Sequence, residues 1–388
     1  MALFTNLFAS QPFKALYVIG SLFFNASRLP LWILKYAFVR QHPTWTFKQA
    51  VTLRVFRAFI DVQSTIRSQP ALPLTPGKEG DQFVIIKRKD EDKDKFKGPM
   101  LANAQTVQPT DIGGVWYPAP LTAAEVEKRD DLLVILHFHG GAYVIGDGRI
   151  EYSGPIARTL LENTPATHVL LPSYRLSKLP PGPDSNPFPA ALQDALTSYL
   201  YLIDELNIPA SKIALGGDSA GGNCAIALLR YIAEFGTKIG VPQPSAALLW
   251  SPWLNPTNPD TSFEYNNPNF PSDYIPASFL TWGVAALAGQ NPPLSGPSVI
   301  ASNPYANALE YGFKTPVPLW VNMGGTEVLC EDGRKWAEMM KGEGNEVVFD
   351  VEDSVCHDVL LVAPIVGMTE GVGRMAKRAG EWLKGVRK

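Results

Sequence analysis

Short apolar runs recur along the chain from residue 132 onward, and segments with helical spacing of apolar residues separate several of them. A continuous apolar run of about four to eight residues is typical of a strand buried on both faces. Such runs predict strands at residues 132–138, 168–172, 212–216, 247–251, 318–323 and 346–351. Helical spacing predicts helices over 190–205 and 222–235. This alternation indicates an α/β fold with a mostly parallel sheet and helices on both of its faces.

Two shorter β-like runs, at residues 82–87 and 114–117, precede this region and bring the predicted number of strands to eight. Helical spacing predicts a further helix over 45–66, and prolines and glycines break the chain after it. We therefore expect an N-terminal segment of apolar helices, residues 1–75, and an α/β domain, residues 76–388.

Residues 252–317 interrupt the alternation of strands and helices and are rich in Pro, Asn, Ser and aromatic residues. A structureless connection of this length is uncommon in a compact domain, so we expect residues 252–300 to contribute to a cap or pocket. The aromatic residues of this stretch indicate that the pocket is largely apolar. They are Phe263, Tyr265, Phe270, Tyr274, Phe279 and Trp282.

The segment Ala15–Val39 is strongly apolar, but Arg28, Pro30 and Lys35 interrupt it. No uninterrupted run reaches the roughly 18 residues that a spanning helix needs. A signal peptide has basic residues before its apolar part, whereas here Lys14 is the first charged side chain, and no clear small-residue cleavage site follows. Three interpretations stay open: a cap helix over a pocket, a helix on a membrane surface, and a transmembrane anchor. We expect an intracellular protein that is cytosolic or peripherally attached to a membrane.

Charge and cysteine content exclude several classes of protein. The 388 residues include 34 Lys and Arg and 37 Asp and Glu, for a net charge of −3. The whole chain therefore carries no basic field for nucleic acid or anionic lipid. Three cysteines, Cys224, Cys330 and Cys356, are too few for a disulfide framework and lack the spacing of a metal site.

The residues Gly217-Asp218-Ser219-Ala220-Gly221 form the pattern G-x-S-x-G between a predicted strand and a predicted helix. This context is typical of a nucleophile elbow, a turn so tight that it strains the serine backbone and requires glycine two positions to either side. The Ser219 hydroxyl would then project at a helix N-terminus, whose dipole favours developing negative charge. Ser219 is the predicted nucleophile.

A second motif, HFHGGAY at residues 137–143, ends the predicted strand at 132–138. Its small residues allow backbone N–H groups to turn toward the nucleophile and stabilise the oxyanion of a tetrahedral intermediate. We expect His139 to shape this loop by hydrogen bonding. The predicted oxyanion donors are the N–H groups of Gly140, Gly141, Ala142 and Ala220.

A serine nucleophile needs a base, and the base needs an acid that orients it. In proteins with this elbow the order along the chain is serine, acid, histidine. Only one of the five histidines, His357, follows Ser219, so it is the predicted base. The predicted strand at 318–323 is followed by three acids, Glu327, Glu331 and Asp332. We favour Glu327, which is closest to the strand end, with Asp332 as the second candidate.

The acid and the base each have a cysteine nearby in the sequence. Cys330 follows Glu327 by three residues and Cys356 precedes His357. If the acid and base meet, the two thiols come close to each other. Buried thiols are the ordinary outcome, and a redox-sensitive pair is the alternative.

Several motifs in register resemble the hormone-sensitive-lipase-like branch of the α/β-hydrolases. They are HGGAY at 139–143, YRL at 174–176, FPAALQDA at 188–195 and GGDSAGG at 216–222. The resemblance runs from Val134 to the C-terminus and implies an α/β-hydrolase catalytic domain with a helical cap. The chain differs from the family pattern in having Ala142 in place of the last glycine of HGGG and Glu327 in place of the usual Asp. It also has Asp358 where an apolar residue often follows the histidine.

The resemblance also implies an activity. Members of the family hydrolyse carboxylic esters and need no metal or organic cofactor. Residues 1–75, with the stretch WTFKQA, are similar to the extensions of fungal members that deacetylate sterols or secondary metabolites. We therefore expect a serine esterase that acts on short acyl esters of a bulky apolar alcohol. Two alternatives stay open: a non-catalytic small-molecule receptor on the same scaffold, and an amidase or formamidase.

Overall fold

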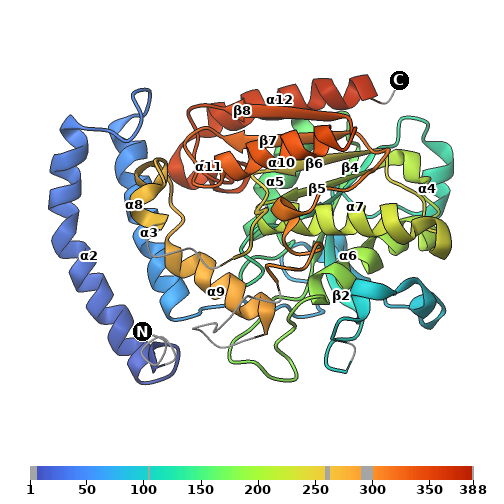
Figure 1. The fold of residues 1–388 in the computed structure, drawn as a ribbon, viewed down its shortest axis with the longest axis horizontal. Coiled ribbons are helices and arrows are strands. Elements are labelled where there is room, and N and C mark those ends of the chain that lie inside the picture. The colour runs from blue at the N-terminus through green and yellow to red at the C-terminus, as the bar shows by residue number, and fades with distance from the viewer. Residues whose placement is uncertain (1–6, 104, 258–262, 290–299, 387–388) are drawn as a thin grey trace.

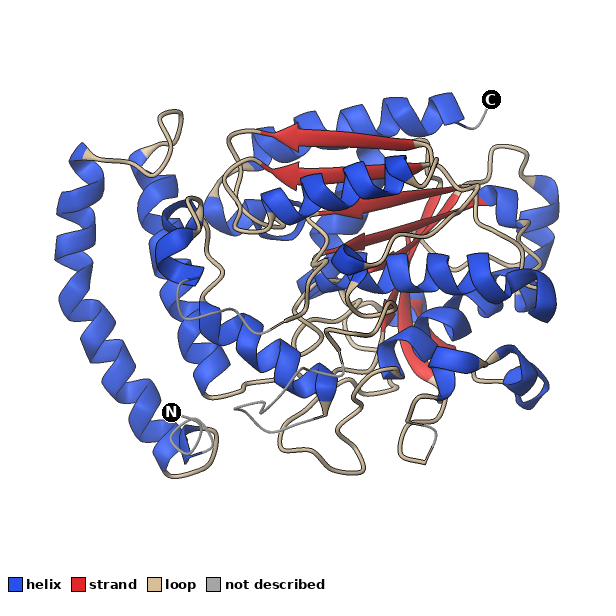
Figure 2. Cartoon of the chain, viewed as in Figure 1, coloured by secondary structure: helices blue, strands red, loops and turns tan. Residues whose placement is uncertain are grey.

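One eight-stranded sheet forms the centre of the protein in a computed structural model that describes residues 7–103, 105–257, 263–289 and 300–386 (Figures 1 and 2). The strands are β1 Phe83–Ile86, β2 Ile112–Tyr117, β3 Val134–Phe138, β4 His168–Ser173, β5 Ile213–Asp218, β6 Ala246–Trp250, β7 Leu319–Gly324 and β8 Val347–Glu352. Their order is β1-β2-β4-β3-β5-β6-β7-β8. β1 and β2 pair antiparallel and β2 pairs antiparallel with β4, whereas all other pairs are parallel. The prediction of eight strands in a mostly parallel sheet is confirmed.

Helices cover both faces of the sheet, which explains why its inner strands are apolar throughout. α5 (Ile150–Asn163), α11 (Val359–Val366) and α12 (Thr369–Val386) pack together on one face. The other face carries α6 (Ala190–Leu200), α7 (Ala220–Ile239) and α10 (Cys330–Gly342). The predicted helix over 190–205 is α6 continued by a π-helical turn, Tyr201–Glu205. Shorter helices are α4 (Ala123–Lys128), α8 (Phe263–Asn266) and α9 (Ala277–Ala288).

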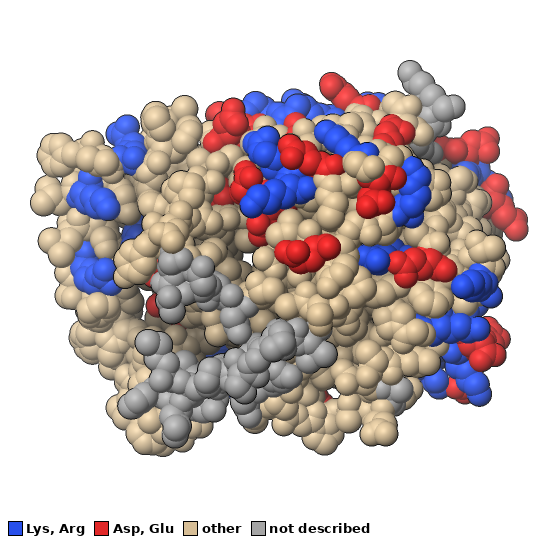
Figure 3. All heavy atoms as spheres, viewed as in Figure 1, with Lys and Arg blue, Asp and Glu red and all other residues tan. Residues whose placement is uncertain are grey.

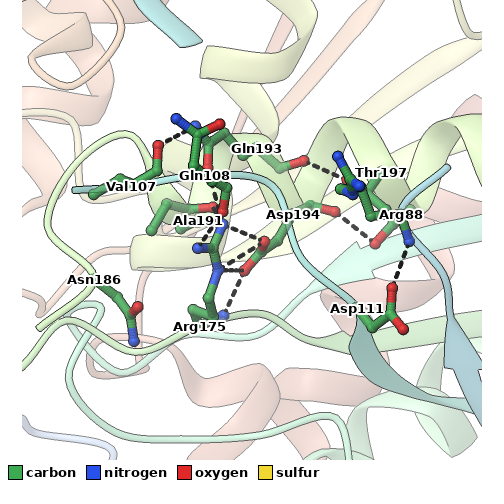
Figure 4. Close-up of polar contacts among 12 residues, drawn as sticks. Arg88, Val107, Gln108, Asp111, Arg175, Asn186, Ala191, Gln193, Asp194 and Thr197 are labelled. Carbon is green, nitrogen blue, oxygen red and sulfur yellow. Dashed lines mark hydrogen bonds and ion pairs between the residues drawn. The ribbon is translucent and has the colours of Figure 1, made fainter. Parts of the chain in front are cut away.

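A polar cluster joins the loop after β4 to α6 (Figure 4). The guanidinium of Arg175 forms an ion pair of 2.8 Å with Asp194, and the Arg175 backbone N–H donates to the same carboxylate. Arg175 also donates to the side chain of Gln193 and to the carbonyl of Gln108. Asp194 is buried, so its charge needs these partners. This ion pair therefore joins two of the sequence motifs, YRL and FPAALQDA.

The two N-terminal helices lie at one end of the molecule, with α2 (Phe13–Phe38) outermost and α3 (Phe47–Thr65) between it and the rest of the protein (Figure 1). α3 begins at a capping box formed by Thr46 and Gln49, and it packs on α9 and α11. α2 packs on α3 through a small apolar cluster separate from the main core. Within that contact the guanidinium of Arg54 lies 4.1 Å from the ring centroid of Trp32.

By length and composition, α2 is the one helix among the described residues that could cross a membrane. It continues through the polar and proline positions that interrupt its apolar sequence. Only Trp32 and Tyr36 of α2 are buried. The helix therefore exposes most of its apolar surface.

Candidate active site

Ser219 lies at the tip of a tight turn between β5 and α7, with φ 50° and ψ −116°. A side chain at Gly217 would place its Cβ 2.3 Å from the carbonyl oxygen of Gly221. A side chain at Gly221 would place its Cβ 1.9 Å from the carbonyl oxygen of Phe138. Glycine is required at both positions for steric reasons, as the elbow pattern predicts.

The structure brings Ser219, His357 and Glu327 together in one chain of hydrogen bonds. His357 Nε2 lies 2.8 Å from Ser219 Oγ, and His357 Nδ1 lies 3.1 Å from Glu327 Oε2. All three side chains are buried. Asp332, the second candidate for the acid, lies in the first turn of α10 and makes no hydrogen bond or ion pair with His357 among the described residues.

The surroundings of His357 favour its protonated form. Burial lowers the pKa of His357, but the hydrogen bond and charge of Glu327 outweigh this effect, with help from the charges of Asp273 and Asp218. The pKa of His357 is therefore raised above the ordinary value of about 6.5. A histidine in this environment readily accepts a proton from a neighbouring hydroxyl.

The loop after β3 lies against Ser219, and a Cβ built on Gly140 would be 3.1 Å from Ser219 Cβ. Gly140 N–H donates to Asp218 Oδ2 at 2.7 Å, so the prediction of Gly140 as an oxyanion donor is wrong. Within the described residues, the N–H groups of Gly141, Ala142 and Ala220 have no acceptor. These three groups therefore remain free to bind an oxyanion.

The aromatic ring of His139 shapes this loop, as the sequence predicts. His139 Nδ1 lies 2.7 Å from the carbonyl oxygen of Gly140, and its ring stacks on Tyr174 with centroids 4.1 Å apart. The Tyr174 hydroxyl donates to the carbonyl of His139 at 2.6 Å. Because desolvation lowers the pKa of His139, the ring is neutral near pH 7.

Asp218 and Asp358 form a buried pair of carboxyl groups beside the same loop. A Cβ built on Gly140 would lie 2.5 Å from Asp218 Oδ2 and 2.9 Å from Asp358 Oδ2. His137 Nε2 lies 2.7 Å from Asp218 Oδ1. Burial and then the charge of Asp218 raise the pKa of Asp358 well above its usual range. The raised pKa favours the protonated form of Asp358, which can donate to the Asp218 carboxylate, and this explains how an acid is tolerated after the histidine.

Sequence reasoning missed Asp273, which lies in the stretch predicted to form the cap. Its buried carboxylate accepts the backbone N–H of Val328 at 2.7 Å and that of His357 at 3.3 Å. Its backbone carbonyl accepts the guanidinium of Arg57 from α3, with Nε at 2.8 Å. Burial raises the pKa of Asp273 to about 6. Asp273 thus contacts α3, the loop after β7 and the loop that carries His357. No local sequence motif marks it.

The cysteines near the acid and the base are free thiols. Burial raises the pKa of Cys330 to about 11 and that of Cys356 well above its usual range. Both are therefore protonated and weakly nucleophilic near neutral pH. Redox pairing between them stays a prediction.

A pocket of about 580 Å³ opens above Ser219 and His357. α3 contributes Phe56, Phe59 and Ile60 to its wall, whereas α2 contributes no described residue. Among the six aromatic residues predicted for the pocket, Tyr274 and Phe279 line it. The other four lie elsewhere: Tyr265 is exposed, Trp282 is buried, and Phe263 and Phe270 pack against each other. Residues 258–262 and 290–299 of the predicted cap lie outside the described residues.

A metal site has no support in the described part of the chain, where no group of three or more His, Cys, Asp or Glu side chains could hold an ion. The hydrogen bonds from Ser219 through His357 to Glu327 make the arrangement suitable for acid–base and nucleophilic chemistry.

Comparison with known proteins agrees with this geometry. A sequence model described as the α/β-hydrolase fold matches residues 135–361, more than half of the chain. The chain therefore belongs to the α/β-hydrolase-fold family, and its resemblance to the hormone-sensitive-lipase-like branch is confirmed. The fungal character predicted for the N-terminal segment stays a prediction.

Two curated relatives are similar over most of this domain. An acetyl-hydrolase of Streptomyces hygroscopicus is 28% identical over 234 residues, which cover 59% of this chain and 69% of the relative. Carboxylesterase NlhH of Mycobacterium tuberculosis is 28% identical over 260 residues, which cover 65% of this chain and 75% of the relative. A solved esterase of the bacterial hormone-sensitive lipase family is 25% identical, with a TM-score of 0.57 over 93% of this chain and 98% of its own.

Proposed function

We propose that the protein is a serine carboxylic ester hydrolase in which Ser219 is the nucleophile, His357 the general base and Glu327 the acid that orients the histidine. The observation that carries the proposal is the continuous path from Ser219 Oγ through both nitrogens of His357 to Glu327, at 2.8 and 3.1 Å. Family membership and the relatives named as esterases and acetyl-hydrolases support the same reaction.

In the proposed reaction, Ser219 Oγ attacks the ester carbonyl while His357 Nε2 takes the hydroxyl proton. The N–H groups of Gly141, Ala142 and Ala220 stabilise the oxyanion of the tetrahedral intermediate. His357 then gives the proton to the departing alcohol, and the acyl group stays on Ser219. Water, activated by His357, hydrolyses this acyl-enzyme and releases the acid.

The proposed substrate is a short acyl ester of a bulky apolar alcohol, such as a sterol or a secondary metabolite. The mostly apolar pocket wall formed by Phe56, Ile60, Ile275 and Phe279 supports an apolar alcohol. The name acetyl-hydrolase of the Streptomyces relative supports a short acyl group. We further propose that α3 and the segment 252–300 together act as the cap over this pocket.

We also propose peripheral membrane contact through α2. Its outward stripe of large apolar side chains, each 61–81% exposed, consists of Leu16, Phe23, Leu31, Leu34 and Phe38. The first 60 residues contain seven Lys and Arg and no Asp or Glu. Figure 3 shows blue side chains among tan ones at the left edge, over α2, whereas blue and red are interspersed over the opposite half. Anionic lipid complements this combination of apolar and basic surface.

A panel of p-nitrophenyl esters of increasing acyl length tests the catalytic proposal, with Ser219→Ala beside the wild type. We expect hydrolysis of the short esters and a loss of at least about 1000-fold in kcat for the variant. Acetanilide-type amides in the same panel test the amidase alternative. Folded wild-type protein that hydrolyses none of these compounds would favour a receptor over an enzyme.

A further inference from the structure

A second apolar cavity, of about 530 Å³, lies between α2 and α3. Leu22, Leu29 and Trp32 line it from α2, and Val55, Ala58 and Val62 line it from α3. Polar lining is confined to a few uncharged side chains, including Ser21, Asn25 and Gln63. We call this cavity the α2–α3 groove. Its volume lies within the range of about 300–1,000 Å³ that ligand sites occupy.

The α2–α3 groove adjoins the catalytic pocket. Phe59, Gln63 and Ser68 line both cavities. α3 thus presents one side to Ser219 and the other to the groove, and these residues form the boundary between the two spaces. Phe59 is more than half exposed, and the contact from Gln63 Nε2 to the Ser68 carbonyl is long at 3.3 Å. Rotation of these two side chains would widen the boundary.

We propose that the α2–α3 groove binds the long lipophilic tail of the alcohol part of the ester whose acyl group lies at Ser219. This inference rests on the proposed esterase function and narrows its substrate class to esters that dissolve in a lipid bilayer. The groove has no charged lining residue among those described, so an uncharged hydrocarbon is the occupant it suits. Each methylene that the groove buries strengthens binding about fourfold.

The position of the groove also explains how such a substrate arrives. The outward apolar stripe of α2 lies on the side of that helix opposite the groove. A helix lying in the lipid surface therefore has its inner side against the groove, and the groove adjoins the catalytic pocket. In this proposal a lipophilic ester passes from the bilayer through the mostly apolar groove, and past Phe59, Gln63 and Ser68, to Ser219.

The test uses two acetate esters in the same phosphatidylcholine vesicles: hexadecyl acetate, which has a long tail, and p-nitrophenyl acetate, which has none. The full-length protein is compared with Ala58→Trp, which fills the groove from α3 without lining the catalytic pocket. A matched control, Ser27→Trp, adds the same side chain at an exposed position of α2 outside the groove. Hexadecanol release is measured by gas chromatography.

We expect Ala58→Trp to lower kcat/KM for hexadecyl acetate at least tenfold and to leave that for p-nitrophenyl acetate within twofold. Ser27→Trp should leave both within twofold. Unchanged hexadecyl acetate hydrolysis in Ala58→Trp, or wild-type enzyme that hydrolyses only the short ester, would overturn the inference while leaving the esterase intact. Wild type inactive on both esters would instead contradict the proposed function.

If Ala58→Trp loses p-nitrophenyl acetate hydrolysis because it folds poorly, Val62→Phe replaces it, with the same expected results. If the groove is instead a contact between two copies of the chain, Ala58→Trp will lower the molar mass measured by light scattering and leave both activities unchanged. That result would also overturn the inference.

Discussion

The surroundings of Ser219 and the N-terminal pair of helices differ in the interactions that hold them. Around Ser219, buried side chains are joined by hydrogen bonds of 2.8 and 3.1 Å, and the serine backbone is strained. α2 is held by a small satellite cluster and leaves large apolar side chains exposed. In our proposal the first region carries out the reaction and the second contacts lipid. We therefore expect substitutions in the two regions to affect different measurements.

Among conservative substitutions near Ser219, we expect Glu327→Gln to lower kcat the most. The variant keeps the size of the side chain but removes the charge that raises the pKa of His357. We expect kcat for p-nitrophenyl acetate to fall about 100-fold to 10,000-fold. His357 must be neutral to act as the base, so activity is lost as the pH falls through its pKa. Without the Glu327 charge that pKa is lower, and the acid limb of the kcat/KM profile should therefore move to lower pH. An acid limb at the same pH in both proteins would exclude Glu327 as the partner of His357.

A smaller effect is expected for Asp273→Ala, because Asp273 positions the catalytic loops without touching Ser219. Removing its carboxylate leaves the N–H groups of Val328 and His357 without an acceptor. We expect kcat to fall about 10-fold to 100-fold with KM within threefold, and the unfolding free energy to fall by about 1–3 kcal/mol. Asp273→Asn retains one acceptor oxygen and should recover part of kcat. Equal losses in the two variants would indicate that the charge, and not the hydrogen bonds, is what matters.

The carboxyl pair gives a prediction about stability and pH. The pKa of Asp358 is raised in the folded protein, so protonation of this carboxyl group stabilises the folded state relative to the unfolded state. Stability from this group is fully present below the unfolded pKa of about 3.9 and is lost as the pH rises through the folded pKa. Asp358→Asn cannot ionise and should raise Tm at pH 9 by about 2 °C relative to wild type. At pH 4 the gain should vanish, and a gain of equal size at both pH values would contradict the account.

The smallest catalytic effect is expected at the N-terminal end. Leu31→Glu combined with Leu34→Glu places two charges on the outward stripe of α2, away from both cavities. We expect hydrolysis of p-nitrophenyl acetate in solution to stay within twofold of wild type. Flotation with vesicles containing phosphatidylserine should fall at least tenfold. Equal flotation of the two proteins would show that α2 does not contact lipid.

Local rules account for the parts of the molecule that could be predicted from the sequence. The steric need for glycine at 217 and 221 depends on a turn of a few residues, and the choice of His357 follows from chain order alone. The inner strands could be predicted because burial on both faces leaves continuous apolar runs.

Features that depend on tertiary contacts could not be predicted in the same way. The N–H of Gly140 is occupied by a carboxylate from a residue 78 positions away, and Asp273 reaches two loops that are distant in sequence. The net charge of −3 also does not show that the first 60 residues contain no Asp or Glu. An average over the whole chain therefore gave no indication of the α2 surface.

The most direct test of the central claim is the site of covalent labelling by a fluorophosphonate, which traps an activated serine. Intact-mass measurement of the full-length protein should show one adduct, and peptide mapping should place it on Ser219. The adduct should be absent from Ser219→Ala and slow to form in Glu327→Gln. An active protein that is not labelled, or is labelled at another residue, would contradict the proposal that Ser219 is the nucleophile.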